Sequence, residues 1–124
     1  MRTRNSRRSL LAIVLAVVFT LSGLIAAQAA SAKTLSGTVG PGFTITLKSR
    51  GKKVKRVKAG TYKFRITDKS DFHNFHIKGP GVNKRITSVA FEGTKSVTLR
   101  LKKGTYRYVC DPHSDDMKGS FKVR

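Results

Sequence analysis

The 124-residue sequence has few residues of several types, and each shortage excludes a class of protein. A single cysteine, Cys110, rules out an internal disulfide and an iron–sulfur cluster held by several cysteines. The chain has no tryptophan, three prolines and six acidic residues against 26 basic ones, which gives a formal net charge of +20. Because 39% of the residues are hydrophobic, a disordered basic tail is disfavoured and one folded domain is expected.

The first 32 residues have the pattern of an export signal. Four arginines among residues 1–9 precede an apolar run over residues 10–27, and the next charged residue is Lys33. Two cleavage motifs of the Ala-x-Ala type follow at 27–29 and 30–32. We therefore predict a signal peptide over residues 1–32, cleaved near Ala29 or Ala32. The remaining chain is expected in the periplasm, the cell envelope or the extracellular space.

Two alternatives to a conventional cleaved signal stay open. The apolar run is longer than the roughly 7–15 residues usual in a signal and approaches the ~20 that span a bilayer, so the first alternative is an uncleaved membrane anchor. The second is a twin-arginine signal at Arg7-Arg8, although an arginine pair arises easily by chance in so basic a segment. All of these interpretations place residues 33–124 outside the cytoplasm.

Residues 33–124 have the alternation typical of a β-sheet domain. Helical periodicity is absent, whereas apolar and polar residues alternate in short stretches separated by glycine- and proline-containing turns. The predicted strands cover residues 35–39, 43–47, 62–66, 72–78, 86–91, 97–101, 104–110 and 120–123. Residues 54–58 are either a charged edge strand or a loop. Short strands at this spacing predict an antiparallel sandwich or barrel without parallel βαβ units.

The basic charge belongs to this domain rather than to the export segment. Residues 33–124 keep 22 of the basic residues and all six acidic ones, a formal charge of +16. Such a surface attracts acidic proteins or other anionic surfaces. Nucleic acid is not predicted as a partner of an exported chain without an evident aromatic stacking platform. Tyr106 and Tyr108 alternate on one predicted strand, where packing explains them more simply.

Three side chains that bind metals lie close together near the C-terminus. Cys110, His113 and Met117 fall within eight residues, directly after a predicted strand. A loop at that point can aim a thiolate, an imidazole and a thioether at one place. One thiolate, imidazoles and a weak thioether form the ligand set that selects type 1 copper, whereas structural zinc sites use more cysteine and no methionine.

The fourth ligand is expected from His73 or His76. If residues 72–78 form a strand, His73 shares the inward face with Phe75 and Ile77. The opposite phase would bury His76 and expose those two apolar side chains, which is the less favourable arrangement. His73 is therefore the preferred ligand, and His76 is expected to be a surface histidine that could substitute for it.

These residues resemble the cupredoxins, in particular small blue copper proteins similar to plastocyanin and amicyanin. The resemblance covers roughly residues 35–123 and is carried by His73-Asn74 and by the loop from Cys110 through His113 to Met117. It implies an eight-stranded Greek-key β-sandwich with one type 1 copper ion. The implied ligands are His73, Cys110 and His113, with Met117 as the axial one. Asn74 is implied to hydrogen-bond across to the loop beside the cysteine.

The resemblance also implies a function. The expected protein is a monomeric, extracytoplasmic one-electron carrier that cycles Cu(II) and Cu(I), is not an enzyme, and serves an acidic redox partner. The alternative is a protein that stores, buffers or delivers copper with the same ligands. The loop departs from the family at residues 114–116, which are more acidic than the apolar residues often found there, so the docking surface is not carried over.

Overall fold

The computed structural model of this chain describes residues 31–124. The predicted export segment lies outside these residues, apart from its last two positions. Within residues 31–124 no helix has the length and apolar character needed to cross a bilayer.

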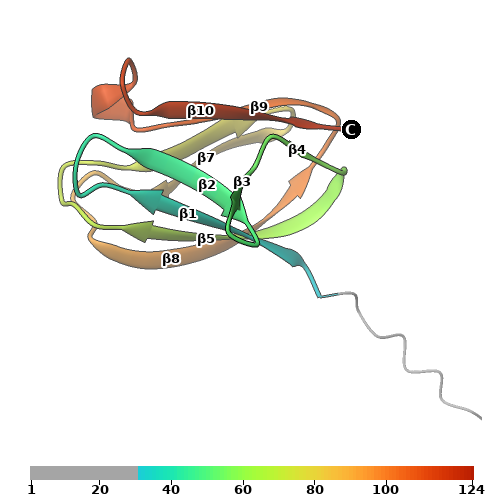
Figure 1. Ribbon diagram of the computed structural model, residues 1–124, viewed down its shortest axis with the longest axis horizontal. Helices are drawn as coiled ribbons and strands as arrows, with labels where there is room; N and C mark the ends of the chain where they lie inside the picture. The colour runs from blue at the N-terminus through green and yellow to red at the C-terminus, as the bar shows by residue number, and fades with distance from the viewer. Residues whose placement is uncertain (1–30) are drawn as a thin grey trace, which may run out of the picture.

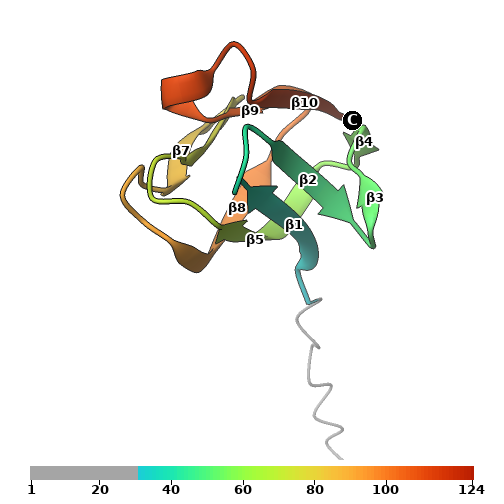
Figure 2. The same cartoon turned by 60° about the vertical axis from the view of Figure 1, so that its left-hand side comes forward.

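The described chain forms two five-stranded sheets that face each other (Figure 2). The first sheet has the strand order β3-β2-β1-β5-β8, with β1 (Lys33–Val39), β2 (Ile45–Ser49), β3 (Lys52–Lys53), β5 (Gly60–Asp68) and β8 (Gly93–Leu101). The second has the order β4-β10-β9-β6-β7, with β4 (Arg56–Val57), β6 (Phe75–Gly79), β7 (Val82–Thr87), β9 (Gly104–Val109) and β10 (Lys118–Val123).

The predicted all-β sandwich is confirmed, and the observed strands differ from the predicted ones in number, direction and position. The eight longer strands are accompanied by the two-residue strands β3 and β4. Two pairs are parallel, β1 with β5 and β4 with β10, while the other pairs are antiparallel. The strand predicted at 86–91 lies instead at 82–87, because the edge strand β7 has three consecutive exposed polar residues at 83–85 and therefore no apolar alternation.

The core lies between the sheets and follows the predicted alternation. In β5, the side chains of Tyr62, Phe64 and Ile66 point inward and are buried. From the other sheet, Tyr108 stacks on Phe75 with ring centroids 5.4 Å apart. Burying one such large side chain contributes roughly 1.5–3 kcal/mol. Tyr106 and Tyr108 are both buried, as the packing interpretation predicted.

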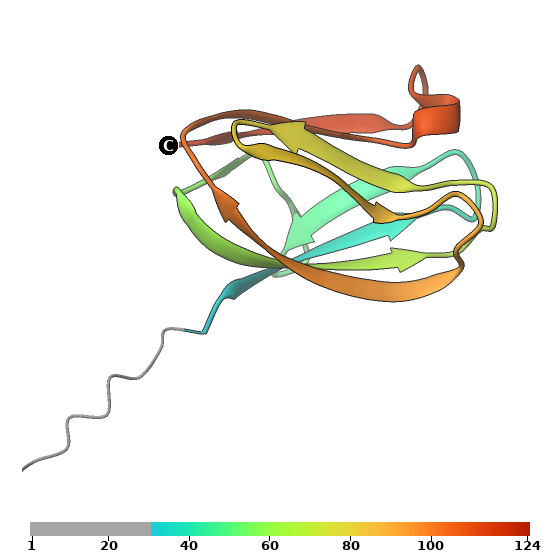
Figure 3. The same ribbon diagram turned by 180° about the vertical axis from the view of Figure 1, so that it is seen from behind.

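Loops gather at the two ends of the sandwich (Figures 1 and 3). At one end, Asp68 pairs with Val39 and with Gly93, so that loops 40–44, 69–74, 88–92 and 110–117 lie together. We call this the Cys110 end. At the opposite end lie the start of β1, residues 50–59, the turns at 80–81 and 102–103, and the C-terminus.

Candidate metal centre

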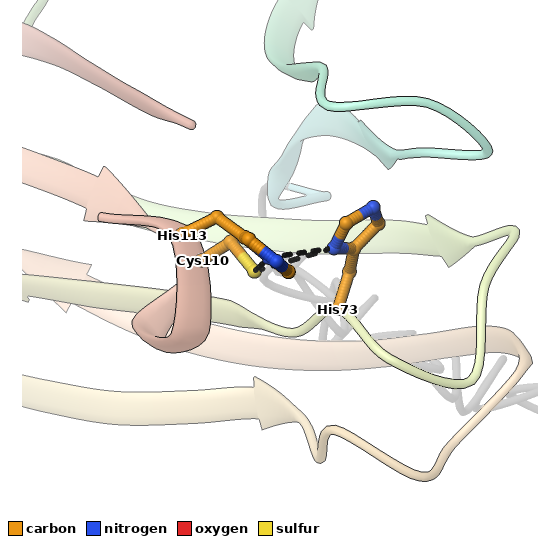
Figure 4. Close-up of side chains that lie close together, drawn as sticks. All are labelled: His73, Cys110 and His113. Atoms are coloured by element: carbon orange, nitrogen blue, oxygen red, sulfur yellow. Dashed lines mark hydrogen bonds between the residues drawn. The ribbon is translucent and has the colours of Figure 1, made fainter. Parts of the chain in front are cut away.

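Three predicted ligands converge at the Cys110 end (Figure 4). His73 lies in the loop between β5 and β6, Cys110 follows β9, and His113 ends the short 3₁₀ helix η1 (Asp111–His113). The Nδ1 atoms of the two histidines are 3.1 Å apart, and each lies 3.6 Å from the Cys110 Sγ atom. His73 and Cys110 are fully buried, whereas His113 is half-buried.

The loop that carries Cys110 and His113 is closed by its own backbone. The His113 amide donates to the Cys110 carbonyl oxygen at 3.1 Å, which forms the turn of η1. The Met117 amide donates to the His113 carbonyl oxygen at 2.8 Å, and the Cys110 amide donates to the Met117 carbonyl oxygen at 3.0 Å. Met117 is thereby held beside Cys110 with its side chain fully buried.

The three donor atoms fit one transition-metal ion. The two Nδ1 atoms and the Cys110 Sγ atom form a triangle. The point in its plane that is equidistant from these atoms lies roughly 2 Å from each, close to the ~2.0–2.1 Å of metal–nitrogen bonds and somewhat under the ~2.3 Å of metal–sulfur bonds. All three atoms carry lone pairs, so packing them at 3.1–3.6 Å is favourable when a cation or proton lies between them. His73, Cys110 and His113 form the cluster of metal-binding side chains identified among residues 31–124.

His73 is fixed by packing rather than by a second hydrogen bond. Its Nε2 is buried and has no hydrogen-bond partner among the described residues. Gly40 lies against the ring, and a Cβ at this position would come within 3.2 Å of the His73 Cδ2 atom. The φ angle of Gly40 is +68°, a conformation that also favours glycine. The loop before β2 therefore holds the imidazole in place sterically.

Asn74 ties the His73 loop to the cysteine loop. Its Nδ2 donates to the Asp111 carboxylate at 2.8 Å, and its Oδ1 accepts from the Asp111 backbone amide at 2.7 Å. The Asn74 backbone amide also donates to the Cys110 sulfur at 3.5 Å. This last contact joins the His73 loop to the cysteine loop at the sulfur atom itself.

His76 is not the surface histidine that strand alternation predicted. It is buried on the outer face of the second sheet, where the side chains of Asp111 and Asn83 cover it. Its Nδ1 lies 2.8 Å from the Asp111 carboxylate, and its Nε2 lies 2.6 Å from the Asn83 Oδ1. Both neighbours are acceptors, so the ring satisfies both when it carries two protons. Strand alternation predicted the correct face of the sheet for His76. Side chains from neighbouring segments cover the ring on that face and bury it.

Asp111 is the charged centre of this network. It accepts hydrogen bonds from His76, Asn74 and Arg85, the last at 3.0 Å. Burial pushes the pKa of Asp111 up, but these three hydrogen bonds together outweigh burial and hold the pKa at about 2. The carboxylate next to Cys110 is therefore ionised at neutral pH and pinned from three sides.

A second buried carboxylate, Asp68, lies at the same end of the sandwich. The Thr87 hydroxyl donates to it at 2.8 Å and in turn accepts from the Phe75 amide at 2.9 Å, which links β5, β7 and β6. Burial raises the pKa of Asp68, against hydrogen bonds from Thr87 and Ser70 that lower it. Its sequence signal is an acidic residue in the inward phase of β5, which the apolar alternation alone does not distinguish from the end of the strand.

Two exposed phenylalanines flank the histidine pair. Phe43 is 60% exposed and packs edge-on against His113 with ring centroids 4.8 Å apart. Phe72 is 48% exposed and lies 4.3 Å from the His73 ring centroid. The sequence predicted both as strand residues, but they lie in the loops before β2 and β6. Two exposed aromatic rings thus lie against the histidine pair, and the acidic residues Asp115 and Asp116 follow His113 in the same loop.

A two-sheet sandwich with His73, Cys110 and His113 gathered at one end is the arrangement of a copper-binding cupredoxin. The family model "Copper binding proteins, plastocyanin/azurin family" matches residues 50–124, so the chain belongs to this family. No curated protein sequence shows significant similarity to the chain.

Solved cupredoxin structures share the fold. A structure of reduced rusticyanin matches with a TM-score of 0.53 and 25% identity over 76% of this chain and 81% of that one. Auracyanin A, a "blue" copper protein from Chloroflexus aurantiacus, matches with a TM-score of 0.51 and 23% identity over 73% of this chain and 98% of that one. A further rusticyanin structure, described as a copper protein, has a TM-score of 0.54 and 22% identity over 76% and 80% of the two chains.

Proposed function

We propose that this chain is an exported, monomeric one-electron carrier with one type 1 copper ion. The observation that carries the proposal is the convergence of two imidazole nitrogens and one cysteine sulfur within 3.1–3.6 Å. His73, Cys110 and His113 would hold the ion, together with the Met117 thioether as the weakest of the four donors. Copper supplies the one-electron couple between Cu(II) and Cu(I) when it is bound.

The chain's own residues make the site rigid and dry. His73, Cys110 and Met117 are fully buried, which excludes water from these three donors. The Asn74–Asp111 hydrogen bonds fix the cysteine loop to the histidine loop, so the donors keep their positions in either charge state. A site that does not rearrange on reduction exchanges electrons rapidly, which favours a carrier over a storage protein.

His113 is the proposed point of electron exchange. It is the one clustered donor that is not fully buried, and the exposed Phe43 and Phe72 rings surround it. A redox partner that docks on these rings comes closest to the metal through the His113 imidazole. Cupredoxins are typically electron carriers rather than enzymes, and we propose no reaction catalysed by this chain alone.

Two rates test this function against copper storage or delivery. The first is oxidation and reduction of the copper-loaded protein by small reagents in a stopped-flow instrument. The second is copper transfer to an excess of a chelator. An electron carrier shows repeated rapid redox cycles while the chelator removes copper slowly. Fast copper release together with slow redox cycling would favour delivery instead.

A further inference from the structure

The charges of this domain are segregated along its long axis. All six acidic residues belong to strand termini or loops at the Cys110 end; they are Asp68, Asp71, Glu92, Asp111, Asp115 and Asp116. The sequence contains no acidic residue from 33 to 67 or from 93 to 110. The net charge of +16 is therefore distributed unevenly over the surface, and the excess of basic side chains lies away from the metal centre.

The opposite end of the sandwich carries the densest group of basic side chains. The segment from the β2–β3 turn to the start of β5 contains six exposed ones: Arg50, Lys52, Lys53, Lys55, Arg56 and Lys58. Four more exposed basic residues lie beside this segment, at the start of β1, in the β8–β9 turn and at the C-terminus: Lys33, Lys102, Lys103 and Arg124. We call this surface the basic end.

The basic end is built on a tight, well-fixed scaffold. Lys122 and Arg124 donate backbone hydrogen bonds to the carbonyl oxygens of Lys55 and Val57, so the segment is attached to β10. Arg50 and Gly51 form the two-residue turn between β2 and β3, and both have positive φ angles. Asparagine or glycine adopts such a conformation more easily than arginine. Arg50 therefore occupies the tip of this turn at a conformational cost.

A shallow groove beside this turn suits an anionic group. It has a volume of about 610 Å³ and includes the basic residues Lys33, Arg50 and Lys58 in its wall. The hydroxyl groups of Ser36 and Ser49 provide further donors, whereas the Tyr62 hydroxyl donates to the Lys58 carbonyl oxygen, and no acidic side chain contributes to the groove. Ammonium, guanidinium and hydroxyl donors in one groove are the groups that bind a phosphate.

We propose that the basic end docks on an anionic phospholipid surface and holds the Cys110 end away from it. Charge complementarity supports a phosphate-bearing surface. The position of Lys33 supports a membrane in particular: β1 begins at the basic end directly after the predicted export segment, so this end of the domain follows the segment out of the membrane, whether the segment is then cleaved or kept as an anchor. In Figure 1 the start of β1 and the C-terminus lie at the end opposite to η1. Docked in this way, His113 faces outward to its redox partner.

Vesicle binding by two charge-matched variants tests the proposal. The chain as the expressing cell exports it is mixed with vesicles of phosphatidylglycerol and phosphatidylcholine in equal parts, and with vesicles of phosphatidylcholine alone. One variant carries Lys52→Gln, Lys53→Gln and Lys55→Gln. The control carries Arg65→Gln, Lys84→Gln and Arg107→Gln, which are exposed positions within β5, β7 and β9. Both variants lose the same formal charge.

The expected result is salt-sensitive binding to the phosphatidylglycerol vesicles that depends on the basic end. Each basic residue at an anionic membrane strengthens binding by about fivefold, so the basic-end variant should lose on the order of a hundredfold and the control much less. Equal losses in both variants would overturn the proposal in favour of diffuse attraction. Binding to polyphosphate but not to the anionic vesicles would overturn the membrane as the docking surface.

Orientation is tested separately by hydrogen exchange on the vesicle-bound protein. Amides of residues 51–58 should become protected, while amides of residues 110–117 should exchange as in the free protein. Protection of 110–117 instead would contradict the proposed orientation. Both measurements apply to the metal-free protein, so they succeed or fail independently of the electron-transfer function.

Discussion

At the scale of single residues, the metal centre depends on side chains that do not themselves bind the metal. Asn74 and Asp111 exchange two hydrogen bonds, and His76 and Arg85 hold the Asp111 carboxylate from its other sides. The position of Cys110 is therefore set by a charged network on the outer face of the second sheet. Changes in this network should alter stability without removing a ligand.

Replacing His76 separates this network from the ligand set. His76→Ala removes a buried ring and one of the hydrogen-bond donors to Asp111, so unfolding of the metal-free variant should need about 1–3 kcal/mol less in a denaturant titration. The blue absorption band of the copper-loaded variant should remain. His73→Ala is the matched control and should abolish the band. Loss of the band in His76→Ala, with His73→Ala tolerated, would reverse the ligand assignment.

Acid stability reports the lowered pKa of Asp111. A carboxyl group whose pKa falls on folding adds stability above its unfolded pKa of about 4, and that stability is lost as the pH falls through the folded value of about 2. With 30% of its side chain exposed, Asp111 contributes at most about 2 kcal/mol.

The Asp111→Asn variant provides the measurement. In the metal-free form, wild type should be more stable than the variant at neutral pH, and this difference should shrink between about pH 4 and pH 2. Asp68 stays in both proteins, so its raised pKa, which has the opposite sign, cancels in the comparison. A stability difference that is constant with pH would show that Asp111 is not held in its charged form.

Met117 should tune the copper rather than retain it. Leucine has a similar volume, so Met117→Leu keeps the buried position filled and the fold intact. The copper-loaded variant should stay blue, while its reduction potential shifts because the weak thioether donor is gone. Voltammetry of both proteins measures the shift. An unchanged potential would place the Met117 sulfur outside the metal's reach.

At the scale of elements, the strands were more predictable than the segments between them. The alternation in β5 and β9 gave their inward faces directly, since one face of each strand packs in the core. The edge strand β7 gave a weaker pattern, and its predicted position was wrong. The cluster of His73, Cys110 and His113 was predictable because its ligand types and spacing are specific. The burial of His76 was not, because it depends on Asn83 and Asp111 from two other segments.

Tyr106 fastens two turns of the sandwich together. Its hydroxyl donates to the Pro80 carbonyl oxygen at 2.7 Å and accepts from the Lys102 amide at 3.0 Å, joining the β6–β7 and β8–β9 turns. Tyr106→Phe leaves both backbone groups without this partner and should cost about 1–3 kcal/mol in thermal or chemical unfolding. Tyr62→Phe removes a single hydrogen bond, to the Lys58 carbonyl oxygen, and should cost less. Equal costs would contradict the proposed fastening.

At the scale of the whole molecule, most of the net positive charge lies at the basic end, whereas the acidic residues lie at the Cys110 end near the metal centre. The nine residues of β5 run from the basic end to the Cys110 end, which separates these ends by roughly 30 Å at ~3.3 Å per residue. This separation is several times the ~8 Å Debye length at physiological salt. The acidic redox partner stays a prediction. The positive charge that would attract it lies mostly away from His113.

Reaction with a small anionic reagent should therefore depend on the nearby acidic residues. Asp115→Asn combined with Asp116→Asn should raise the rate of reduction by hexacyanoferrate(II) by a factor of about two or more at physiological salt. The variant with glutamine at positions 52, 53 and 55 should change this rate much less. Stopped-flow absorbance measures both rates. A larger effect from the lysine variant would show that the total charge, rather than the local charge, controls access.

The most direct test of the proposed metal centre is the visible absorption and electron paramagnetic resonance of the protein titrated with Cu(II) and then reduced with ascorbate. The geometry of His73, Cys110 and His113 predicts saturation at one copper per chain. It also predicts an intense blue thiolate-to-copper band that bleaches reversibly and has a small copper hyperfine splitting. Cys110→Ser should lose this band while its fold remains. A colourless or ordinary square-planar copper spectrum in wild type, or a blue band retained in Cys110→Ser, would contradict the account.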